Sequence, residues 1–527
     1  MRLAFPPRRF VTATIIAIQL FGGVALAQET DTAQPGDTPD AAAQPQEQNP
    51  LIEKGEAALE AGDFAAAMQA YEQLAQEAQQ MPEPEGSENR GLAIVGHARV
   101  LAAMGEYEAA LEGFDVAVND YPSLSAFIGR GQLHLEMGQP DLALTDFETV
   151  VKAQRGNLAA QLGLGTCYVL LGQAEQGVKP LSRVIAADPQ NAEAYRLRGA
   201  AYAGLYKIQQ AISDLEQSIS LNPDNYEAYF SLGIAQLRAE DYQASVDQLG
   251  KAIEHYKPKP NQEEQPYVQG YLTRASAFIE LGKSLTDATA KNAAYQAAVD
   301  EANRLLEQLN EDNPNEALAR AAALYGRGIG ERMLGELGRA VQTFTEAIEL
   351  NPDMGEAYLR RGICFHLIGE DTMAISDFKT SARINYDDPR ASLWEGFTQA
   401  KLGEYHDAVR AYGDAIAASD RYTPAYVNRG LAYMMLGEPE KAVADFDEAI
   451  RLEPTKAEHY FKRGVAHRQL GDNEEASESF ASAIEFDNKH AGAYRHMAEV
   501  MQALGRTELA AEYRQKANEL APEKAAQ

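Results

Sequence analysis

The sequence has 527 residues, a formal net charge of −31, 45% hydrophobic residues and two cysteines. So acidic a chain argues against nucleic acid as the partner, because counterion-release binding needs a basic surface. Two cysteines exclude a disulfide-stapled scaffold and a zinc site built from paired Cys-x-x-Cys motifs. The length would ordinarily predict several domains, because a single hydrophobic core stops growing at about 250–300 residues.

Residues 1–27 have the parts of an export signal. Three arginines precede an apolar run over residues 11–24, and Ala25-Leu26-Ala27 has the small-x-small pattern that signal peptidase reads. The run is shorter than the stretch of about 20 residues that a membrane-spanning helix needs, so we expect cleavage near Ala27 rather than a retained anchor. The mature chain is then predicted to be periplasmic or secreted, with no stable membrane insertion. Losing three arginines and no acid moves its net charge from −31 to −34.

Residues 28–49 have no aromatic and no β-branched aliphatic residue, and Pro, Gln and Asp recur in them. Such a segment cannot bury enough apolar surface to offset its chain entropy. We interpret it as a disordered, low-complexity linker.

A ladder of small residues begins at Gly55. Glycines recur at intervals of 34 positions from Gly131 to Gly233 and again from Gly328 to Gly464, and Ala98, Ala275 and Ala498 occupy equivalent places, which gives 13 ladder positions. A second glycine follows most of them after seven residues, usually behind an apolar residue, which is typical of a helix C-cap.

Other residues keep fixed distances from the ladder. Ala stands 12 positions after it in ten repeats, Phe or Tyr 16 after it in eight, and Pro 24 after it in six. The pattern predicts two short helices per repeat, with small residues where the helices approach closely, aromatics filling the gap and proline ending the second helix. One repeat alone could not bury its faces, so the repeats must stack.

These units resemble the tetratricopeptide repeat, most clearly in AYVNRGLAYMMLGEPEKAVADFDEAIRLEPT, residues 425–455. The resemblance covers residues 48–522. It implies an all-α, right-handed superhelical solenoid of about 13 repeats, whose first helices line a concave groove that binds protein or peptide.

The spacing divides the array. We expect an N-terminal block of about six repeats over residues 50–256 and a C-terminal block of about six over residues 321–527. Between them, residues 257–320 form an irregular extended repeat, since 19 extra residues separate Ala275 from Gly328. The polar helix from Thr507 to Leu520 is predicted to cap the end of the array.

Arg precedes the ladder position in seven repeats, and in four of these Asp stands 15 positions after the ladder. We predict an ion pair between the two helices of each such repeat, with a structural role in fixing their register. The pairs are Arg130–Asp146, Arg198–Asp214, Arg361–Asp377 and Arg429–Asp445.

The resemblance places the partner-binding residues on the first helices. In the C-terminal block the positions three before and one after the ladder are apolar, which predicts a continuous strip; the alternative is that neighbouring repeats bury these residues. Some family members hold a terminal carboxylate with Lys and Asn at these two positions, and apolar residues there argue against that mode. Beside the strip, Arg360 and Lys462 could pair with acids of a partner or only balance the acidic second helices, and Trp394 could be an anchor. The strip consists of Tyr325, Ile329, Leu359, Ile363, Leu393, Phe397, Val427, Leu431, Phe461 and Val465.

No pattern predicts catalysis, a metal or a cofactor. The histidines lack the helical spacing of a zinc protease, and no nucleophile elbow occurs. Cys167 and Cys364 are predicted to be buried free thiols. We therefore expect a non-enzymatic scaffold or adaptor. The alternatives are an assembly factor associated with an envelope polysaccharide and an enzyme with its site in residues 257–315.

Overall fold

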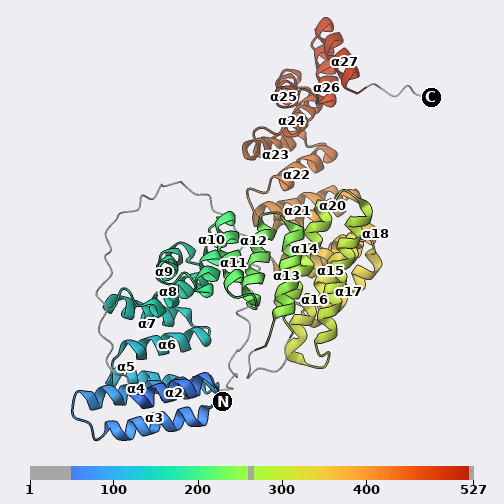
Figure 1. Ribbon diagram of the computed structural model, residues 1–527. Helices are drawn as coiled ribbons and strands as arrows, with labels where there is room; N and C mark the ends of the chain where they lie inside the picture. Colours follow the sequence, from blue (N-terminus) through green and yellow to red (C-terminus); the bar gives the residue numbers. More distant parts are fainter. Residues whose placement is uncertain (1–48, 259–265, 522–527) are drawn as a thin grey trace, which may run out of the picture. The chain divides into compact units, whose positions relative to one another are not determined.

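The computed structural model describes residues 49–258 and 266–521 (Figure 1). The predicted signal peptide, and all of the predicted linker except Asn49, lie outside these residues. Within the described residues the chain forms 26 α-helices and one 3-10 turn and has no strand. The prediction of an all-α solenoid with about 13 helical pairs is confirmed. None of the described helices is long and apolar enough to cross a membrane.

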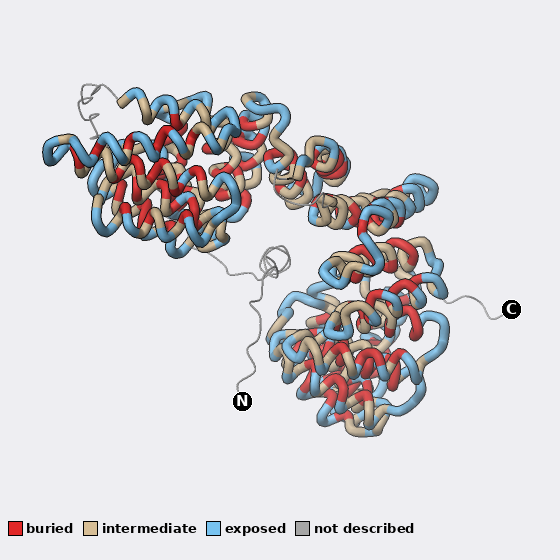
Figure 2. The backbone as a smooth tube through the Cα atoms, turned by 90° about the horizontal axis from the view of Figure 1, so that it is seen from below, coloured by how far each residue is buried: buried red, intermediate tan, exposed pale blue. Residues whose placement is uncertain are grey.

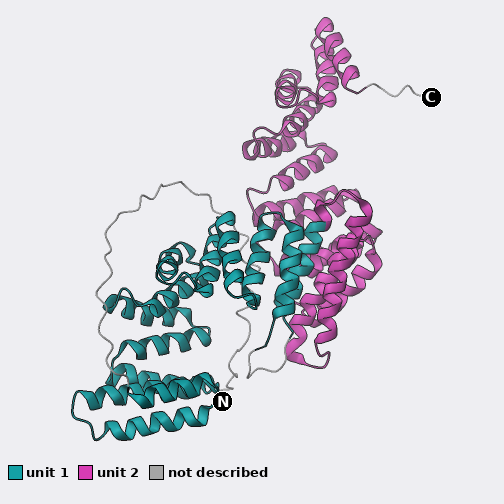
Figure 3. Ribbon diagram, in the orientation of Figure 1, with its two compact units in different colours: residues 1–281 teal, residues 282–527 magenta. Residues whose placement is uncertain are grey.

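Even-numbered helices are the first helices of the repeats, and odd-numbered helices are the second. The chain divides into unit 1, residues 1–281, and unit 2, residues 282–527 (Figure 3). The division falls inside α14. The helices up to that point are α2 Pro50–Glu60, α3 Phe64–Ala78, α4 Glu85–Ala103, α5 Tyr107–Asp120, α6 Leu124–Glu136, α7 Pro140–Ala153, α8 Leu158–Leu170, α9 Ala174–Ala187, α10 Ala192–Gly204, α11 Ile208–Leu221, α12 Tyr226–Arg238, α13 Tyr242–His255 and α14 Val268–Ser284.

Unit 2 continues the alternation with α15, the longest described helix. Its helices are α15 Ala288–Gln308, α16 Ala317–Met333, α17 Leu337–Leu350, α18 Gly355–Ile368, α19 Asp371–Ile384, α20 Pro389–Lys401, α21 Tyr405–Ala418, α22 Thr423–Leu436, α23 Pro439–Leu452, α24 Ala457–Leu470, α25 Asn473–Phe486, α26 Ala491–Ala503 and α27 Thr507–Leu520, with the 3-10 turn at Pro314–Glu316 before α16. The last helix has the bounds predicted for the capping helix. Only Ala510 and Ala517 of it are buried.

The turn between the two helices has a residue with positive φ in twelve of the 13 repeats, and in the remaining repeat Gly282 lies inside α14. Ten of the glycines seven residues after the ladder have φ between 70° and 92°, which the missing Cβ makes inexpensive. In the two repeats that have no glycine there, Tyr206 and Glu240 adopt φ values of 57° and 61°. The turn therefore has a left-handed backbone conformation both with glycine and with residues that disfavour it.

The core of a repeat forms where the ladder residue faces the aromatic 16 positions later. A Cβ on Gly430 would lie 2.8 Å from the ring of Phe446, which is fully buried. Figure 2 shows buried residues along the packed helices of each unit. Cys167 and Cys364 are buried and free, as predicted. The small ladder residue thus lets the aromatic ring fill the space between the two helices.

Candidate functional site

Each arginine predicted to pair with an aspartate of its own repeat lies against that aspartate. Arg429 donates from Nε and Nη2 to the two carboxylate oxygens of Asp445 over 2.9 and 2.7 Å. The same two-bonded geometry holds for the other three pairs, Arg130–Asp146, Arg198–Asp214 and Arg361–Asp377, at 2.7–3.0 Å. All four aspartates are buried, and two parallel hydrogen bonds fix the mutual orientation of the groups.

These arginines also reach the second helix of the preceding repeat. Arg130 donates to Asp115 over 2.7 Å, Arg198 to Ser182 over 3.1 Å and Arg361 to Thr345 over 2.9 Å. Each of these three arginines therefore connects three helices rather than two. Sequence reasoning missed this contact, although the signal is present as a polar residue 15 or 16 positions before the arginine.

Glu395 of α20 stands at a position where the two neighbouring repeats have arginine before the ladder. Its carboxylate lies 3.7 Å from the ammonium of Lys379, on the preceding second helix α19. Burial raises the pKa of Glu395, against the opposing charge of Lys379. α20 is therefore still connected to α19 by an ion pair, but the acid is on the first helix and the base is on the second.

The predicted apolar strip is not continuous at the surface. Leu359 and Ile363 are 1% and 6% exposed and pack in the core around Phe378, so the alternative of burial between repeats applies to them. The structure differs from the prediction here because α18 turns these side chains toward α19. Tyr325, Ile329, Leu393, Val427, Phe461 and Val465 are half-buried.

Two members of the strip are well exposed on consecutive first helices. Phe397 of α20 is 47% exposed and Leu431 of α22 is 40% exposed. Met435, one turn after Leu431, is 62% exposed; it was not predicted, although it stands five residues after a ladder position. Trp394 lies edge-on to Phe397, with ring centroids 5.8 Å apart. We call Trp394, Phe397, Leu431 and Met435 the apolar patch.

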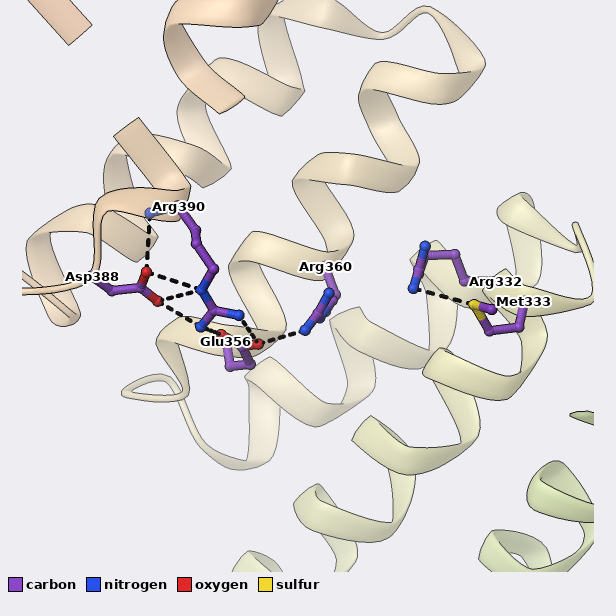
Figure 4. A network of polar contacts seen from close by, with 6 residues as sticks. All are labelled: Arg332, Met333, Glu356, Arg360, Asp388 and Arg390. Carbon is purple, nitrogen blue, oxygen red and sulfur yellow. Dashed lines mark hydrogen bonds and ion pairs between the residues drawn. The ribbon is translucent and has the colours of Figure 1, made fainter. Parts of the chain in front are cut away.

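A group of charged residues precedes the patch in the sequence of first helices (Figure 4). Arg360 of α18 donates to Glu356 over 2.8 Å, and Arg390 of α20 donates to the same carboxylate over 3.2 and 2.9 Å. Arg390 also binds Asp388. Arg332 of α16 donates to the sulfur of Met333 over 3.4 Å. We call Arg332, Arg360, Arg390, Glu356 and Asp388 the arginine cluster.

The titration behaviour of the cluster follows from its burial and its charges. Burial lowers the pKa of Arg332, and the neighbouring positive charge of Arg360 lowers it further. Burial also opposes the charge of Arg360, but Tyr325 and Glu356 outweigh it and raise its pKa. Burial opposes ionisation of Asp388, yet hydrogen bonds from Arg390 lower the pKa of that carboxyl.

Lys462, the other predicted cation, is already paired. Its ammonium contacts Glu458, and that carboxylate also lies 3.1 Å from His490. Burial raises the pKa of the Cys364 thiol to about 11, so the thiol stays protonated near neutral pH. No group of three or more His, Cys, Asp or Glu residues among the described residues is arranged to hold a metal.

Models of four tetratricopeptide repeat families match the chain. The matched residues are 134–201, 196–263, 325–389, 423–456 and 457–490. This chain is a tetratricopeptide repeat protein. The search of curated proteins found no match.

Several solved structures are similar to parts of the chain. A crystal structure of MamA is 25% identical with a TM-score of 0.31, covering 34% of this chain and 95% of that chain. YrrB, described as having an unusual peptide-binding site, is 22% identical with a TM-score of 0.32, covering 35% and 94%. A tetratricopeptide repeat protein from Parabacteroides merdae is 16% identical with a TM-score of 0.37, covering 52% and 98%.

Proposed function

We propose that this protein is an exported, non-catalytic scaffold that binds an extended segment of another protein on the first helices of unit 2. The observation that carries the proposal is the apolar patch. Repeats that stack on one another bury their apolar side chains, so large apolar side chains left exposed on two successive first helices are available to a partner.

The patch has the features of an interaction surface. Full burial of one large apolar side chain contributes about 1.5–3 kcal/mol, and aromatic residues dominate binding energy at interfaces. Met373 on second helix α19 is 52% exposed as well and lies outside the patch. A glutamate introduced at Met373 therefore controls for charge added at an exposed apolar residue outside the patch.

The experiment compares capture by residues 28–527 with capture by two variants. Phe397→Glu with Leu431→Glu places two charges in the patch, and Met373→Glu places one on a second helix. Leu393→Glu is unsuitable, because Leu393 packs beside Tyr412 in the core. We expect a protein captured from envelope extract to be lost with the patch variant and retained with the control. Equal retention by all three contradicts the proposal.

A polysaccharide ligand would need aromatic rings with open faces. The ring of Trp394 is stacked on Phe378, with 6.2 Å between the ring centroids, and meets Phe397 and His366 edge-on. This arrangement favours a protein segment as the ligand. Binding of envelope glycan fragments that survives the patch substitutions but disappears with Trp394→Ala would favour the alternative.

Export is tested separately from binding. We expect the chain purified from envelope fractions to begin at Gln28, because cleavage after Ala27 fits the small-x-small pattern. N-terminal sequencing measures this directly. An intact N-terminus in a membrane fraction would contradict cleavage and support a retained anchor.

A further inference from the structure

Arg332 is a half-buried cation without an anion. No described carboxylate lies within ion-pair distance of it, although most arginines of unit 2 have such a partner. Its Nε is buried without a hydrogen-bond acceptor. The groups that act on it electrostatically are Arg360, Cys364 and two tyrosines, Tyr325 and Tyr295. Burying an unpaired charge is costly, so the fold by itself gives no reason for arginine here.

Arg360 does not relieve this imbalance. Its Nε is also buried without an acceptor, and it shares the carboxylate of Glu356 with Arg390. Asp388 is occupied by Arg390. The arginine cluster thus sets three guanidinium groups against two carboxylates, in a chain whose net charge is −31. In Figure 4 the dashed line from Arg332 runs to Met333, whereas those from Arg360 and Arg390 run to carboxylates.

We infer that Arg332 and Arg360 form a subsite for the carboxylate of an aspartate or glutamate side chain on the bound segment. The inference rests on the proposed function, since it names the chemistry of the partner. Charge complementarity supports it, because a carboxylate offers the acceptor oxygens and the negative charge that the two guanidinium groups lack here. This subsite differs from the binding mode in which Lys and Asn hold a terminal carboxylate. That mode needs polar residues at the positions that Leu359 and Ile363 occupy here.

The position of the subsite relative to the apolar patch sets a spacing. Arg332 and Arg360 come from α16 and α18, and the patch lies on α20 and α22. Packed helices are about 8–10 Å apart, so two helix spacings are about 20 Å, which an extended chain covers in about six residues. A side chain can reach the arginines while its backbone continues toward the patch; a chain terminus would bring its whole last residue into the same half-buried space.

Two displayed random libraries test the inference against residues 28–527. In the first, 12-residue peptides are displayed as internal loops with no free terminus; in the second, their C-terminus is free. We expect the loop library to yield peptides with Asp or Glu about six residues from an aromatic or aliphatic residue. Arg332→Gln with Arg360→Gln should weaken a selected peptide by tenfold or more. Arg410→Gln, an exposed arginine on second helix α21, should leave its affinity unchanged.

The other outcomes are distinct. Peptides selected without an acidic residue, or bound equally by the double variant, overturn the inference and leave the proposed function standing. If acidic peptides are selected only from the library with a free C-terminus, the subsite binds a terminal carboxylate and not a side chain, and the inference is overturned. If neither library yields a binder, the proposed function fails together with the inference.

A stability measurement separates a binding role from a structural one. Arg332→Met should keep or raise the melting temperature, because it removes a charge that has no partner. Arg361→Met should lower the melting temperature, because it leaves the buried Asp377 unpaired. Equal lowering by both substitutions would make Arg332 a structural residue and overturn the inference.

Discussion

Arginine occurs on the first helices in two opposite electrostatic situations. Arg429 donates two hydrogen bonds to a buried aspartate of its own repeat, and those bonds raise its pKa. Arg332, in another first helix, has no carboxylate partner among the described residues and a lowered pKa. The first situation recurs in four repeats and holds the two helices of each together. The second occurs on α16, two first helices before the apolar patch begins on α20.

Substitutions in the Arg429–Asp445 pair test how much an unpaired buried charge lowers the free energy of unfolding. Asp445→Ala should lower the free energy of unfolding by about 3 kcal/mol, because it leaves Arg429 partly buried without its partner. Arg429→Met with Asp445→Leu should lower it by less than half as much, since no unpaired charge remains. Urea unfolding followed by circular dichroism measures both. Equal losses would mean that the pair acts only through packing.

At the ends of two first helices the backbone has a conformation that favours glycine, but the sequence has another residue. The sequence predicts a glycine C-cap in most repeats, and the structure has the left-handed turn in the two repeats with Tyr206 and Glu240 as well. A residue with a Cβ is strained in this conformation by about 1–2 kcal/mol. The stacking of neighbouring helices therefore imposes the turn on residues that do not favour it.

Glycine at such a position should stabilise the protein. Glu240→Gly should raise the free energy of unfolding by about 1 kcal/mol, because it removes the strain at a φ of 61°. Gly437→Glu makes the reverse change at a φ of 74° and should lower it by a similar amount. Thermal melts of the two variants give the measurement. A loss of stability in Glu240→Gly would show that the side chain contributes more than the strain removes.

At the scale of the molecule, described helices contact mainly their own repeat partner and the adjacent repeats. Stability in such an array is close to a sum of repeat terms and nearest-neighbour terms. This also answers the question posed by the length of the chain, because a stack grows by adding repeats and needs no larger core.

The stacking predicts that damage stays local. Phe446→Ala removes a fully buried ring and should lower the local stability by about 3–5 kcal/mol. Hydrogen exchange should become faster in α21–α24, while α16 and α17 of the same unit keep their protection. Mass spectrometry of exchanged peptides measures this. Uniform acceleration across unit 2 would mean that the unit unfolds as one cooperative block.

The sequence by itself determined the repeat, the two-helix unit, the polar last helix and the aspartate partners of Arg130, Arg198, Arg361 and Arg429. It could do so because each of these depends on contacts at a fixed spacing within one repeat, and a contact that recurs leaves a period. The tertiary structure alone decided that Leu359 and Ile363 are buried while Phe397, Leu431 and Met435 are exposed. It also decided that Arg332 has no carboxylate partner among the described residues. These facts depend on how neighbouring helices pack and on which charges they bring together, and residues at equivalent positions of the repeat do not share them.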